Sequence, residues 1–72
     1  MTYEEQAIVN FLGRSPGSYF ARREIARKAV KRQVYEENQH WADAPLVALV
    51  ERGVIEQNTE GLYRVKQTDT SS

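Results

Sequence analysis

The chain has 72 residues, with ten basic side chains, ten acidic side chains and no cysteine. This length allows one small domain, and the missing cysteine excludes disulfide bonds and thiolate metal sites. A single histidine also excludes a metal site built from several histidines. The domain therefore has to fold by hydrophobic packing alone, and we expect neither a metal nor a cofactor.

The apolar residues are too dispersed for a membrane span, which needs roughly 18 of them in a row. Residues 1–6 contain two acids and no base, unlike a signal or transit peptide. We expect a cytoplasmic protein that makes no contact with a membrane.

The first predicted element is a helix over residues 2–12. Thr2 and Glu5 have the spacing of a capping box at its start. Its apolar side chains recur at helical spacing on one face: Ala7, Ile8, Phe11 and Leu12. Gly13 and the turn-forming residues 14–18 indicate its end. Tyr19 and Phe20 follow, too few for an independent strand but able to add a bridge to a sheet.

A second helix is predicted from Arg22 to about Gln33. It places its apolar residues on one side, namely Ile25, Ala26, Ala29 and Val30. The opposite side carries a basic stripe of Arg23, Arg27 and Lys31. Residues 34–39 give no clear assignment.

A third helix with the apolar stripe Leu46, Leu49 and Val50 is predicted to end at Gly53. Its start has two alternatives. If Asp43 is the cap, Pro45 falls in the first turn, where proline is tolerated. If Asn38 is the cap, Pro45 lies inside the helix at a cost of about 3 kcal/mol or a kink. Local physics favours Asp43.

The end of the chain has the pattern of a β-hairpin. Residues 54–57 and 62–66 are β-type runs, and the turn formers 58–61 between them include Gly61, which can take a positive φ. Residues 67–72 form a polar tail that we expect to be disordered. The single domain therefore covers residues 1–66.

Two segments carry a resemblance to winged helix-turn-helix domains: residues 19–29, YFARREIARKA, and residues 46–65, LVALVERGVIEQNTEGLYRV. The first resembles the short strand and second helix, and the second resembles the third helix running into the wing. With the first helix the match covers residues 2–66, at the level of fold type. The resemblance implies a small α+β domain of three helices followed by a two-stranded antiparallel wing, and it places the third helix's cap at Asn38.

The zero net charge is an average over uneven blocks, because residues 14–32 carry +6 and residues 33–60 carry −5. The resemblance implies binding to double-stranded DNA, as in a small transcriptional regulator, and a basic stripe is the usual footprint of phosphate contacts. The candidate contacts are Arg23, Arg27, Lys28 and Lys31 for phosphates, Gln39 and His40 for bases, and Arg64 and Lys66 behind the wing tip.

The alternative interpretation is a winged helix that binds a protein or a second copy of itself. The third helix is poor in base-reading side chains, since outside its apolar residues it offers only Asp43, Glu51 and Arg52. The candidate interaction residues are Tyr35, Trp41 and Val47. Catalysis has no support, because the Ser, His and Asp residues lack a nucleophile-elbow context and the glycines form no phosphate loop. We expect no catalytic residue and no enzyme.

Overall fold

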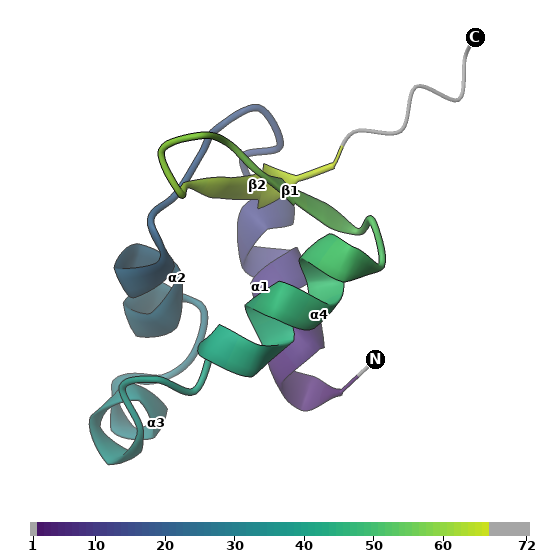
Figure 1. The fold of residues 1–72 in the computed structure, drawn as a ribbon. Helices are drawn as coiled ribbons and strands as arrows, with labels where there is room; N and C mark the ends of the chain where they lie inside the picture. Colours follow the sequence, from purple (N-terminus) through teal and green to yellow (C-terminus); the bar gives the residue numbers. More distant parts are fainter. Residues whose placement is uncertain (1, 67–72) are drawn as a thin grey trace, which may run out of the picture.

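The computed structural model describes residues 2–66, in which four helices precede a two-stranded antiparallel sheet (Figure 1). The elements are α1 (Tyr3–Gly13), α2 (Arg22–Lys28), α3 (Arg32–Glu37), α4 (Asp43–Glu51), β1 (Ile55–Gln57) and β2 (Tyr63–Val65). The predicted small α+β class and the hairpin after the helices are confirmed, with four helices in this part of the chain where three were predicted. The tail expected to be disordered lies outside the described residues.

Helix α1 begins with the predicted capping box. The backbone N–H of Glu5 donates to the Thr2 hydroxyl at 3.2 Å, and the N–H of Thr2 donates to the Glu5 carboxylate at 3.1 Å. These bonds satisfy donors that the first turn of a helix leaves without backbone partners. Ile8 and Leu12 on its inner face are fully buried.

Helix α2 ends at Lys28, so the prediction of one helix to about Gln33 is wrong. The indole N–H of Trp41 donates to the carbonyl of Ala26 at 2.8 Å. In a continued helix the N–H four residues later would take this carbonyl. The chain bends at residues 29–30, and α3 starts at Arg32 with Lys31 as its cap residue.

Helix α4 begins at Asp43, which rules out the start at Asn38. The cap residue is Ala42, which makes no side-chain bond, so Asp43 is the first helical residue and not the cap. Pro45 therefore lies in the first turn, where its missing N–H costs no helical hydrogen bond. The Asn38 side chain instead accepts the N–H of His40 at 3.0 Å in the preceding turn.

The hairpin pairs Ile55 with Val65, Glu56 with Arg64 and Gln57 with Tyr63. Phe20 adds the predicted bridge, because its N–H and carbonyl both bond to Tyr63, at 2.7 and 2.8 Å. This bridge fixes the loop before α2 to the sheet.

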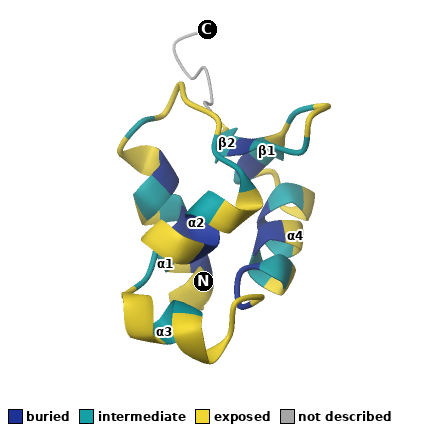
Figure 2. Cartoon of the chain, turned by 90° about the vertical axis from the view of Figure 1, so that its left-hand side faces the viewer, coloured by how far each residue is buried: buried dark blue, intermediate teal, exposed yellow. Residues whose placement is uncertain are grey.

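The core lies where α1, α2, α4 and the hairpin face one another. Its fully buried side chains are Ile8, Leu12, Ile25, Leu46, Leu49 and Ile55. Figure 2 shows α3 as largely exposed, and no residue of α3 is buried. Helix α3 therefore stands on the outside of the core, beside α2. None of the helices in residues 2–66 has the length and apolar character of a membrane span.

Candidate functional site

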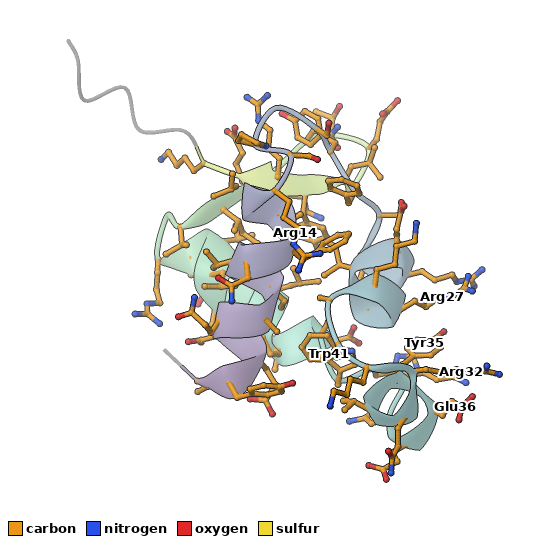
Figure 3. All side chains as sticks on the ribbon, turned by 180° about the vertical axis from the view of Figure 1, so that it is seen from behind. Arg14, Arg27, Arg32, Tyr35, Glu36 and Trp41 are labelled. Atoms are coloured by element: carbon orange, nitrogen blue, oxygen red, sulfur yellow. The ribbon has the colours of Figure 1, made fainter. Side chains whose placement is uncertain are left out.

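A groove of about 870 Å³ lies between α2 and α3. It is lined by five cations and one carboxylate, together with an aromatic ring and two polar side chains at its rim. The lining residues are Arg22, Arg23, Ala26, Arg27, Lys28, Arg32, Tyr35, Glu36, Gln39 and His40. Figure 3 shows Arg27 extending from α2 to the same side as Arg32 and Tyr35 from α3.

The two helices line this groove because of how each meets the core. Helix α2 buries Ile25 and Ala26, so Arg23 and Arg27, four residues apart, share an exposed face. On α3, Arg32, Tyr35 and Glu36 have the spacing of one helical face. The Trp41–Ala26 hydrogen bond ties the segment after α3 back to α2 and so sets the position of the second wall.

Three of the five cations have carboxylate partners. Lys28 lies 3.0 Å from Glu24, Arg32 lies 2.7 Å from Glu36, and Arg22 lies 3.6 Å from Asp43. Their side chains are all 40% exposed or more, and exposed pairs contribute about 1 kcal/mol or less. A phosphate can therefore displace these carboxylates at little cost.

Arg23 and Arg27 supply the uncompensated charge of the groove. Both are exposed, and neither has a carboxylate within 4.0 Å in the part of the chain that the structure describes. A guanidinium presents several N–H donors in a planar fork that matches the oxygens of a phosphate. The positive charges of the groove that have no carboxylate partner among the described residues are therefore both on α2.

Gln39 and His40 lie at the rim, in the turn between α3 and α4. The Nδ1 atom of His40 is 3.6 Å from the Asp43 carboxylate, which also pairs with Arg22. Both rim side chains are exposed, so the Gln39 amide and the His40 imidazole are accessible to a bound molecule.

The groove thus brings together five of the eight predicted DNA contacts: Arg23, Arg27, Lys28, Gln39 and His40. It also adds Arg22 and Arg32, which the sequence interpretation missed. In an unbroken helix Arg32 would fall on the same side as Ile25, so only the break after Lys28 turns it toward the groove. Lys31 is exposed but lies outside the lining.

The hairpin cations also lie outside the groove. The Nε of Arg64 donates to Glu56, and its guanidinium carbon is 4.7 Å from the centre of the Tyr19 ring. The hydrogen bond to Glu56 raises the pKa of Arg64 above its usual value, so this charge is permanent and already paired. The backbone N–H of Lys66 donates to Val54, which places Lys66 beside the segment that follows α4.

The residues predicted for protein interaction do not form one patch. Trp41 is 8% exposed and belongs to the core, so it offers little surface to a partner. Tyr35 lines the groove, whereas Val47 does not and is 56% exposed on α4. The exposed residues of α4 are Ala44, Val47 and Glu51, so this helix presents two apolar side chains and one carboxylate.

Comparison of the chain with models of known families, with curated proteins and with solved structures finds no match. Within residues 2–66 no group of three potential ligands is placed to hold a metal ion. The groove between α2 and α3 is therefore the feature whose chemistry indicates a function.

Proposed function

We propose that the protein binds DNA through the groove between α2 and α3, as a small cytoplasmic regulator of the winged-helix type. The observation that supports this proposal is the lining itself, which contains five cations, two of them, Arg23 and Arg27, with no carboxylate within 4.0 Å in the described residues. Phosphate contacts dominate the affinity of proteins for nucleic acids. A concave surface with this charge is suited to an anionic backbone.

The two unpaired arginines make the first contacts in this proposal. Arg23 and Arg27 bond to phosphate oxygens, and Arg32 joins them by exchanging Glu36 for a phosphate. Hydrogen bonds between charged partners are about twice as strong as neutral ones. The chain's total charge is zero, so binding depends on the local field of the groove and is sensitive to salt.

Gln39 and His40 are the candidates for base contacts. Phosphate contacts position a protein on DNA, and sequence is distinguished by bonds to base edges. A glutamine amide pairs with adenine, and an imidazole offers one donor and one acceptor. These side chains adjoin the phosphate-binding walls, as base-reading groups must.

Charge reversal in the groove tests this function. Arg23→Glu/Arg27→Glu should weaken binding to mixed-sequence DNA at low salt by roughly tenfold or more, because two charge-assisted hydrogen bonds are lost and two repulsive charges gained. Fluorescence anisotropy gives the dissociation constants. The control is Lys66→Glu, which changes the charge outside the groove and should have a much smaller effect.

The same titration followed by NMR locates the contact. The proposal expects amide shift changes concentrated on α2, α3 and the turn at residues 38–42. Absence of binding at low salt, or shift changes confined to the hairpin, would rule it out.

A further inference from the structure

The exposed face of α4 and the groove differ in whether their side chains suit double-stranded or single-stranded DNA. A helix that enters the major groove reads base edges through side chains with hydrogen-bonding groups. The exposed residues of α4 are Ala44, Val47 and Glu51. Two of them have no polar side-chain atom, and the third places a negative charge near any phosphate backbone. Helix α4 is therefore poorly equipped to read a duplex.

The groove has the opposite character. Tyr35 lines it and is half-buried, so part of its aromatic surface is accessible and part is held by the core. The cations Arg27 and Arg32 extend to the same side from the two walls (Figure 3). An aromatic ring within a positively charged groove is the combination by which proteins bind single strands.

We propose that this groove binds single-stranded DNA, with an unpaired base stacked on Tyr35 and the adjoining phosphates on Arg23 and Arg27. This inference rests on the proposed function and names the form of its ligand. In a duplex the bases are already paired and stacked, so none reaches Tyr35 without being flipped out. An unpaired strand presents its base and its phosphates to the groove together.

The positions of Arg32 and Tyr35 on α3 support the assignment of the base to Tyr35 and of the phosphates to the arginines. Arg32 and Tyr35 are three residues apart and share one helical face, which places a charge beside the ring. The Arg32 side chain is 89% exposed, and within residues 2–66 its one carboxylate partner is Glu36. It is therefore free to follow a phosphate next to a stacked base, while the core holds the ring of Tyr35 in place.

The experiment compares three ligands with the full chain at one low salt concentration: a mixed-sequence single strand, the duplex formed with its complement, and polyglutamate of equal charge. We expect the single strand to bind at least about fivefold more tightly than the duplex, because one stacked base contributes to its affinity. Tyr35→Leu should weaken single-strand binding about tenfold and leave duplex binding within about twofold. Tyr35→Phe, which keeps the ring, should bind like the wild type.

A strand containing 2-aminopurine adds a readout of stacking itself. Its fluorescence should be quenched on binding to the wild type and to Tyr35→Phe, and not on binding to Tyr35→Leu. Circular dichroism establishes that each variant is folded. If Tyr35→Leu does not fold, the quenching by the wild type and by Tyr35→Phe decides the question, and its absence overturns the inference.

The remaining outcomes separate this inference from the proposed function. Equal or tighter binding of the duplex, with no effect of Tyr35→Leu on either form, overturns the single-strand assignment and leaves DNA binding by the groove intact. Polyglutamate bound as tightly as the single strand also overturns it, because charge alone then explains the affinity. Failure of both DNA forms to bind overturns this inference and the proposed function together.

Discussion

At the scale of single residues, Trp41 ties the segment after α3 to α2, one wall of the groove. Its indole N–H donates to Ala26 at 2.8 Å and its side chain is almost completely buried. This one contact joins the end of α2 to the segment before α4. The second wall of the groove, α3, lies in the chain between the two residues that this bond joins, so Trp41 supports the site although it does not line the groove.

We predict that Trp41→Phe lowers the free energy of unfolding by about 2 kcal/mol, because the buried carbonyl of Ala26 loses its donor. Urea unfolding followed by far-UV circular dichroism measures this change, since the variant has no tryptophan to report fluorescence. Tyr3→Phe is the control, because Tyr3 is 67% exposed and its change should stay within about 0.5 kcal/mol. Equal stability of the two variants would show that the indole bond does not support the fold.

The sequence predicted some groove residues and missed others for a physical reason. Arg23, Arg27 and Lys28 follow from helical spacing within α2, which is a local property. Arg32 depends on the break after Lys28, where the Ala26 carbonyl accepts the indole N–H of Trp41 in place of a helical N–H. Helical periodicity carries no information about such a contact.

The start of α1 and the end of α4 carry local capping signals and were predictable, and the start of α2 at Arg22 was predicted as well. The capping box of Thr2 starts α1. Gly53, whose φ is +78°, follows the C-cap residue of α4. The cap residues of α2, α3 and α4 make no side-chain hydrogen bond. Helices α2 and α3 have seven and six residues, too few to be stable alone. The end of α2 and both ends of α3 follow from packing, and for that reason the sequence interpretation merged the two helices.

The end of α4 is a Schellman motif. The N–H of Gly53 donates to Val50 at 3.1 Å and the N–H of Val54 donates to Leu49 at 3.0 Å. The positive φ of Gly53 is required for both bonds. Gly13 at the end of α1 differs, because its φ is not positive and an added Cβ would meet no atom within 4 Å.

The two glycines should therefore respond oppositely to alanine. We predict that Gly53→Ala lowers the free energy of unfolding by about 1 kcal/mol, because alanine is strained in the left-handed region. Gly13→Ala should raise it by about 0.5–1 kcal/mol through helix propensity. Chemical unfolding of both variants measures the difference. Destabilisation of similar size at both positions would contradict this account of the two helix ends.

Across the whole molecule, zero net charge conceals a separation of charge. Five of the six cations of residues 22–32 line the groove, whereas the exposed acid of α4, Glu51, lies outside it. The cation on β2, Arg64, is paired with Glu56. The sequence indicated that basic and acidic residues are separated along the chain. The positions of α2 and α3 in the fold bring the basic residues together around a groove.

The central claim is that the groove between α2 and α3 binds the phosphates of DNA, and salt dependence tests it most directly. Each phosphate contact with a single strand contributes about −0.7 to the slope of log K against log salt, so two to five contacts predict a slope of about −1.4 to −3.5. Arg23→Ala/Arg27→Ala should make the slope shallower by about 1.4, and Lys66→Ala should leave it unchanged. Equal slopes for the wild type and the double variant, or a change with Lys66→Ala as large as with the double variant, would contradict the claim.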